Sequence, residues 1–197
     1  MNTSVAGRIG PNAITRLAEA LPPLVGGALT REVFEGAGLA AYLREPPQDM
    51  VDETEVARLH RVLRQTLGGP IAAQAARRAG TLTGNYLLAH RIPKPAQWVL
   101  KHLPAPMAAR SLLKAIQGHA WTFCGSGQFS SEAGPPVVLT IRHNPLCRDL
   151  HTEAPACDFY AATFERLFRV LVHPATEVTE THCEARGDPY CRFELRW

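Results

Sequence analysis

Residues 179–197 read TETHCEARGDPYCRFELRW, and this stretch sets the architecture of the C-terminal half of the chain. Arg-Gly-Asp-Pro at 186–189 is a turn signal, because glycine and proline supply the backbone angles that a chain reversal needs. From Cys191 to Trp197, apolar and charged residues alternate as in a half-buried strand. We therefore expect an antiparallel hairpin with Cys183 and Cys191 on either side of its turn. The two cysteines could form a disulfide, bind a metal or lie as buried thiols.

The composition indicates an ordinary globular protein. The chain has 197 residues, of which 46% are apolar and 20% are charged. Its formal net charge of +3 is too small, and its basic residues too scattered, for a nucleic-acid binder. We expect no signal peptide and no membrane-spanning segment, because the apolar windows are interrupted by charged residues, glycine or proline, and we therefore expect a cytoplasmic protein. Five cysteines are an odd number, which together with a reducing compartment favours metal binding over disulfides.

The first half of the chain has a helical pattern. The clearest helix is predicted at 53–67, with Asp52 as its N-cap and Gly68 at its end. A second helix is predicted at 70–90, where small residues recur at helical spacing and would admit either another helix or a flat ligand; they are Ala72, Ala76, Ala79 and Thr83. Shorter helices are expected at 13–21, 30–43, 96–102 and 107–117.

The second half has a strand pattern around one helix. Strands are predicted at 119–124 and 136–143, where side chains alternate on either side of a Gly-Pro turn signal. An aromatic-rich helix follows at 157–173, and the C-terminal hairpin comes after it. The order hairpin, helix, hairpin predicts an α+β fold in which the helical N-terminal half packs on a small antiparallel sheet. We divide it into a helical extension at 1–50 and a ligand-binding domain at 51–197.

A predicted metal site gathers residues around the C-terminal hairpin. Besides Cys183 and Cys191, the expected fold brings Glu180 and Cys157 to the same place. Three thiolates and one carboxylate form a filled tetrahedral shell, which is typical of structural zinc. Glu180 has the opposite strand parity to Cys183, so a β-bulge or an early turn is needed to bring both inward. Cys147 is the alternative fourth ligand, and Cys124 has no predicted role.

The order Cys157, Glu180, Cys183, Cys191, with the ending EARGDPYCRFEL, resembles the 4-vinyl reductase domain family. That family includes a bacteriochlorophyll biosynthesis protein and the sensor domains of phenol-responsive transcriptional activators. The resemblance covers about 54–197, and the stretches GHAWTFCGSGQF and RHNPLC favour the bacteriochlorophyll branch. It implies a structural zinc beside a ligand pocket. It also implies a homodimer, because the sensor relatives pair through their helical parts.

The resemblance leaves three functions open. The first is a carrier or chaperone that binds a Mg-porphyrin or chlorophyllide and hands it to other enzymes of the magnesium branch. The second is a 4-vinyl reductase acting on divinyl (proto)chlorophyllide, although no redox-cofactor motif accompanies Gly-Ser-Gly at 125–127. The third is a small-molecule sensor module.

A flat tetrapyrrole needs an apolar pocket with a few polar groups, and the chain offers candidates for both. The expected wall and axial ligands are Trp98, His102, His119, Trp121 and Phe123. The expected partners of the propionates are Arg91, Lys94, Lys101 and Arg110.

Overall fold

The C-terminal hairpin forms as the sequence predicts. In the computed structural model, which describes residues 7–197, strand β5 (Glu177–His182) pairs with β6 (Cys191–Arg196). Between them lie a short 3-10 helix, η3 (Glu184–Arg186), and Gly187, whose φ of 92° is in the left-handed region that glycine adopts freely. Asp188 closes the turn by accepting a hydrogen bond from the backbone amide of Cys183 at 2.8 Å.

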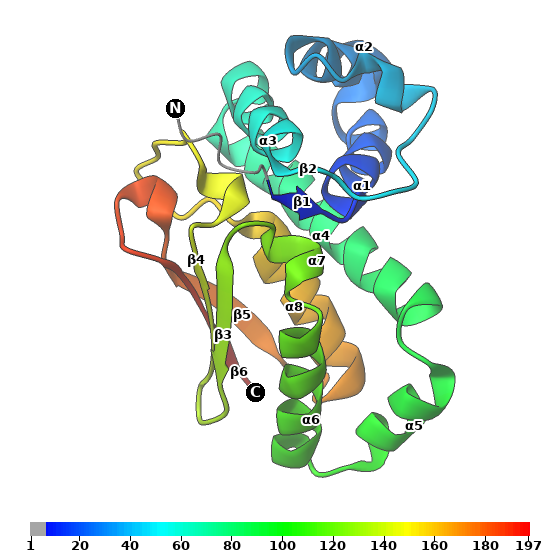
Figure 1. The fold of residues 1–197 in the computed structure, drawn as a ribbon, viewed down its shortest axis with the longest axis vertical. Helices are drawn as coiled ribbons and strands as arrows, with labels where there is room; N and C mark the ends of the chain where they lie inside the picture. The colour runs from blue at the N-terminus through cyan, green and yellow to red at the C-terminus, as the bar shows by residue number, and fades with distance from the viewer. Residues whose placement is uncertain (1–6) are drawn as a thin grey trace.

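Two hairpins and one helix build the sheet layer. Strands β3 (Gln128–Glu132) and β4 (Val137–Arg142) form the first hairpin, and the sheet order is β3-β4-β6-β5 with every pair antiparallel. Helix α8 (Asp158–Leu171) connects the hairpins and packs against β5, with Phe164 of α8 edge-on to Phe193 of β6. The α+β class and the hairpin, helix, hairpin order are therefore confirmed (Figure 1).

The predicted strand at 119–124 is wrong. Helix α6 (Ala105–Gly118) extends to residue 118, and a single helical turn, α7 (Trp121–Cys124), follows it, so that β3 begins only at Gln128. The alternation of residues at 119–124 fits a strand, but Phe123 and Cys124 are neighbours that both turn inward. Cys124 is buried, and Phe123 packs edge-on against Phe129. A strand would place these neighbours on opposite faces, whereas one helical turn lets both reach the core.

The helical half lies on α4 and consists of short helices with proline in their first turns. The elements are β1 (Arg8–Ile9), α1 (Asn12–Ala20), α2 (Pro22–Gly36), η1 (Ala40–Leu43), β2 (Val51–Asp52), α3 (Glu53–Leu67), α4 (Gly69–His90) and α5 (Lys94–His102). The helices predicted at 13–21, 53–67, 70–90, 96–102 and 107–117 are confirmed within a few residues. The helix predicted at 30–43 ends at Gly36, because Gly38 with φ 69° breaks it before η1.

The residues at 7–50 share one hydrophobic core with the rest of the chain. Helix α1 packs on α4, and the two-stranded ladder β1–β2 joins residue 9 to residue 51 at the predicted domain boundary. Residues 1–6 of the predicted extension lie outside the described residues, and the division at residue 50 stays a prediction. Along residues 7–197, no helix is both long and apolar enough to cross a membrane.

Helices α4 and α8 approach each other closely, and the small residues of α4 make this possible. A Cβ at Gly80 would lie 2.2 Å from the carbonyl oxygen of Phe159, and one at Gly84 would lie 2.7 Å from Cβ of Arg166. Thr163 donates a hydrogen bond to the Gly80 carbonyl at 3.1 Å. The small-residue stripe is buried, so it serves helix packing rather than a flat ligand.

Gly80→Ala should lower the free energy of unfolding by about 1–3 kcal/mol, because the added methyl group forces α4 and α8 apart. Urea denaturation followed by circular dichroism measures this. Gly69→Ala is the matched control, since a Cβ there meets nothing within 4 Å in the same helix. Equal stability of the two variants would contradict the close packing of α4 on α8.

Candidate metal centre

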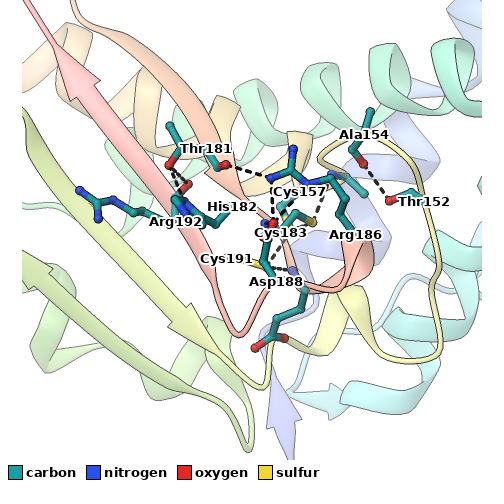
Figure 2. A network of polar contacts seen from close by, with 12 residues as sticks. Thr152, Ala154, Cys157, Thr181, His182, Cys183, Arg186, Asp188, Cys191 and Arg192 are labelled. Atoms are coloured by element: carbon teal, nitrogen blue, oxygen red, sulfur yellow. Dashed lines mark hydrogen bonds and ion pairs between the residues drawn. The ribbon is translucent and has the colours of Figure 1, made fainter.

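Four buried cysteines converge beside the C-terminal hairpin. Cys147 ends the 3-10 helix η2 (Pro145–Cys147), Cys157 is the residue before α8, Cys183 follows β5, and Cys191 begins β6. Their sulfur atoms all lie within 4.8 Å of one another, and all five cysteines of the chain are free thiols. Figure 2 shows Cys157, Cys183 and Cys191 pointing toward a common centre behind the hairpin turn. This cluster could hold a metal ion.

The distances within the cluster match a tetrahedral thiolate site. The Sγ–Sγ distance is 3.2 Å from Cys147 to Cys157, 3.5 Å from Cys157 to Cys191 and 3.8 Å from Cys157 to Cys183. Sulfur ligands at about 2.3 Å from a metal in a tetrahedron are about 3.8 Å apart. The four side chains therefore stand close to the positions that a four-coordinate metal ion requires.

Backbone and amide N–H groups are directed at the sulfurs. Nδ2 of Asn144, a buried side chain, lies 3.2 Å from both Cys157 Sγ and Cys191 Sγ. The amide of Ala156 donates to Cys183, and the amide of Glu184 donates to Cys191, each at 3.4 Å. Hydrogen bonds of this kind favour the deprotonated form of a thiol, which is the form that binds metal.

The thiols of the cluster differ in acidity. Hydrogen bonds from the Cys147, Cys157 and Cys191 thiols hold the pKa of Cys183 well below its usual range. Burial raises the pKa of the Cys157 thiol well above its usual range, and the neighbouring thiols add to this shift. A bound cation reverses the balance at Cys157, because it stabilises all of the thiolates that it contacts.

Glu184 holds the loop that carries Asn144. Its two carboxylate oxygens accept hydrogen bonds from the amides of His143 and Asn144, at 2.6 and 2.7 Å. Sequence reasoning missed both Asn144 and Glu184. The signal available was Asn-Pro at 144–145, because the Asn144 side chain caps η2 by accepting from the Leu146 amide at 3.0 Å.

Glu180, the predicted fourth ligand, lies beside the cluster. A register shift between Glu180 and His182 supplies the bulge that its parity required, and Cys183 already lies beyond β5. One carboxylate oxygen of Glu180 accepts from the Cys157 amide at 2.8 Å, while Oε1 is buried with no hydrogen-bond partner. Burial, followed by the charge of Cys183, raises the pKa of Glu180 to about 9. Cys147 completes the four-sulfur group in its place.

The predicted tetrapyrrole residues do not form one wall. Trp98 and His102 stack on each other on the exposed side of α5, with ring centroids 4.3 Å apart. His119 and Trp121 are exposed on either side of the junction between α6 and α7. Phe123 packs instead into the aromatic core, and the four predicted propionate partners are exposed; they are Arg91, Lys94, Lys101 and Arg110.

Comparison with known proteins places this centre in a family. A model of the 4-vinyl reductase domain matches residues 137–197, a span that contains all four clustered cysteines. The chain is 43% identical over 192 residues to the bacteriochlorophyll synthase 23 kDa chain of Cereibacter sphaeroides, covering 98% of this chain and 92% of that protein. It belongs to that protein's family. The protein of the same name from Rhodobacter capsulatus is 40% identical, with 95% and 86% covered. The resemblance to the 4-vinyl reductase domain family is confirmed.

Solved structures share the fold of this family member. An Fe(II) unliganded H-NOX protein mutant from K. algicida aligns over 95% of this chain and 96% of its own, with a TM-score of 0.62 and 10% identity. The phenol-responsive sensory domain of the transcription activator PoxR aligns over 74% of each chain, with a TM-score of 0.52 and 15% identity. At these identities the likeness concerns the fold alone.

Replacing Cys147 should separate the two possible ligand sets. Cys147→Ser should abolish metal binding at the centre and lower the melting temperature, because the metal joins η2, α8 and the hairpin. Glu180→Gln should retain the metal, since the amide still fits where the carboxyl group lies. Elemental analysis of unchelated protein and thermal unfolding measure both effects.

Cys124→Ser is the control, because Cys124 is buried outside the cluster and burial raises its pKa to about 12. Loss of metal from Glu180→Gln but not from Cys147→Ser would show that the carboxylate, not the fourth thiolate, is the ligand. Equal metal content in all three variants would contradict a metal at the cluster.

Proposed function

We propose that this protein binds a magnesium tetrapyrrole of bacteriochlorophyll synthesis, a Mg-porphyrin or a chlorophyllide, and passes it to another enzyme of the magnesium branch. The observation that carries the proposal is the 43% identity over nearly the whole chain to a protein named bacteriochlorophyll synthase 23 kDa chain. Similarity of this extent, without a large insertion or truncation, is expected of proteins that act in the same process. The relative's name therefore supports a role in bacteriochlorophyll synthesis here.

The fold supports a tetrapyrrole as the ligand by analogy. One solved structure of the same fold concerns heme distortion in the H-NOX family, and it aligns over 96% of this chain with a TM-score of 0.59. A shared fold does not fix a ligand, because sites vary on a common scaffold. The analogy adds weight only because the closer sequence relatives are named for a tetrapyrrole pathway.

A cavity of about 380 Å³ is the candidate binding place, and it lies between α6 and the sheet. Its walls come from the start of α6, the turn between β3 and β4, and the end of β6. The volume is in the range of small-ligand pockets, and the walls are largely apolar. The lining residues that the argument uses are Pro106, Arg110, Leu195, Arg196 and Trp197.

Arg110 is the cavity residue best suited to a carboxylate. It is exposed and forms no ion pair in the described part of the chain, whereas Arg196 lies 2.7 Å from a carboxylate oxygen of Glu194. A guanidinium group can bind a propionate through two parallel hydrogen bonds. The described lining contains no histidine, so a magnesium ion held there would keep water as its axial ligand.

The Gly-Ser-Gly segment at 125–127 supports binding rather than reduction. The Ser126 amide and hydroxyl both donate to the buried Glu53 carboxylate, at 2.7 and 2.6 Å, and Arg148 pairs with the same carboxylate. A Cβ at Gly125 would lie 2.0 Å from Glu53 Oε2. The loop therefore packs around a carboxylate, which would repel the phosphates of a dinucleotide. Reduction of a vinyl group would need a hydride or electron donor from elsewhere.

The cysteine cluster holds a structural zinc ion in this proposal, with Cys147, Cys157, Cys183 and Cys191 as its ligands. Four thiolates fill a tetrahedral shell and leave no position for water, so the zinc stabilises the fold and takes no part in chemistry. Its supporting observations are the distances between the sulfurs and the N–H groups directed at them.

The protein is proposed to act in the cytoplasm as a homodimer that pairs through its N-terminal helices. Exposed Leu29 on α2 is consistent with such pairing. Light scattering at micromolar concentration should give twice the monomer mass, and a monomer mass would refute the dimer while leaving tetrapyrrole binding intact.

Titration with divinyl chlorophyllide should shift its absorption spectrum and quench tryptophan fluorescence at a near-stoichiometric ratio. Arg110→Ala should weaken binding about tenfold or more, because a charge-assisted hydrogen bond is lost. Trp98, His102, His119 and Trp121 do not line the cavity, so alanine variants at these exposed positions should bind normally. Weakening by one of them instead of Arg110→Ala would move the site to the surface predicted from sequence.

Turnover is the result that separates the alternatives. Conversion of the divinyl to the monovinyl pigment by purified protein with NADPH alone would overturn the carrier proposal in favour of a reductase. Absence of binding to any tetrapyrrole, with binding of a small phenol, would overturn both in favour of a sensor.

A further inference from the structure

The helical hairpin formed by α5 and α6 carries an unusual concentration of positive charge. Residues 56–131 contain no aspartate or glutamate, and the only three lysines of the chain lie in this hairpin; they are Lys94, Lys101 and Lys114. All three are exposed, and in the part of the chain that the structure describes none of them forms an ion pair. An unopposed positive surface of this kind attracts an anionic partner.

Acidic residues of the neighbouring elements do not neutralise this charge. Helix α8 packs against both helices of the hairpin, and its Glu165 already pairs with Arg77 and Arg169. Strand β3 packs against α6, and its Glu132 forms no ion pair among the described residues. The hairpin thus keeps its net positive field.

Large apolar side chains project from the same hairpin. Trp98 is 63% exposed and Val99 is 49% exposed on α5, and Met107 is 52% exposed on α6. Figure 1 shows α5 and the start of α6 at the end of the molecule remote from α1 and α2. Exposed tryptophan and valine next to lysines are costly in water, and this combination is typical of segments that lie at a membrane interface.

We propose that the α5–α6 hairpin docks on the surface of a lipid bilayer that contains anionic phospholipid. The lysines contact the headgroups, while Trp98, Val99 and Met107 enter the boundary between headgroups and acyl chains. An acidic protein surface would also attract the lysines, but it does not explain why an indole ring is presented to solvent among them. The docking is independent of the tetrapyrrole proposal, because the hairpin lysines do not line the cavity.

Vesicle flotation tests this with the full-length protein. Vesicles of phosphatidylcholine with about 30% phosphatidylglycerol should retain the protein at low salt, and vesicles of phosphatidylcholine alone should retain much less. Adding about 0.5 M NaCl should release most of it, because salt screens the attraction to headgroups. The Trp98 fluorescence should shift to shorter wavelength on binding, and the three lysines should be protected from acetylation.

Matched variants separate the hairpin from net charge and from general hydrophobicity. Lys94→Glu with Lys101→Glu should lower the partition coefficient about tenfold or more, whereas Arg31→Glu with Arg44→Glu should change it little, although each pair takes the formal charge from +3 to −1. Trp98→Ser should lower partitioning several-fold, while Trp121→Ser should not. Trp121 is the matched control because it is 62% exposed.

Three results would overturn the proposal. They are no retention by anionic vesicles, equal loss in the lysine and arginine pairs, and salt-sensitive retention that Trp98→Ser leaves unchanged. The last would identify the hairpin as a site for an acidic protein. The lysine variant should still bind divinyl chlorophyllide, so failure of the docking proposal and failure of the proposed function are distinguishable.

Discussion

The closure of four sulfur atoms around one centre is the constraint on which the C-terminal domain depends. The cysteines come from a loop, the start of α8 and both strands of the last hairpin, segments that share little other packing near the centre. The Asn144 side chain bonds to two of the sulfurs, and Glu184 fixes the backbone of Asn144. The site therefore has a second layer of contacts that orients the ligands before any metal arrives. Because the hairpin supplies two of the sulfurs, the register of β5 and β6 is tied to the centre.

The second constraint is the close contact of α4 with α8. Glycine at positions 80 and 84 allows the two backbones to approach, and Thr163 reinforces the contact by donating to the Gly80 carbonyl. Helix α8 thus lies between the sheet and the helical half, with its aromatic side directed at the sheet. The space in which a ligand was expected between those two halves is occupied by α8 itself. The remaining open volume lies to one side, between α6 and the end of β6.

Much of the fold and part of the metal centre could be predicted from local pattern. Helix 53–67 was predictable because Asp52 accepts from the Thr54 amide at 2.8 Å and Gly68 ends the helix. The alternation after Cys191 was predictable because one face of β6 is buried. The strand at 119–124 was not, because six residues of alternation also fit one helical turn, and only contacts with Phe129 and Tyr160 decide between them. Likewise, exposed Trp98 and His102 have a ligand-like spacing on α5, but spacing does not reveal which side of a helix faces the core.

By itself, the sequence determined the family, the order of the elements and three of the four clustered cysteines, since these follow from residue types at short spacing. The tertiary structure alone decided that Cys147, and not Glu180, completes the four-sulfur group. The physical reason is that Cys147 lies 44 residues from Cys191 along the chain, yet their sulfurs are 3.5 Å apart. Glu180 is near Cys183 in sequence, but its carboxyl group turns to the amide of Cys157. Which side chain fills a site of this kind depends on long-range chain closure, and the local pattern does not encode it.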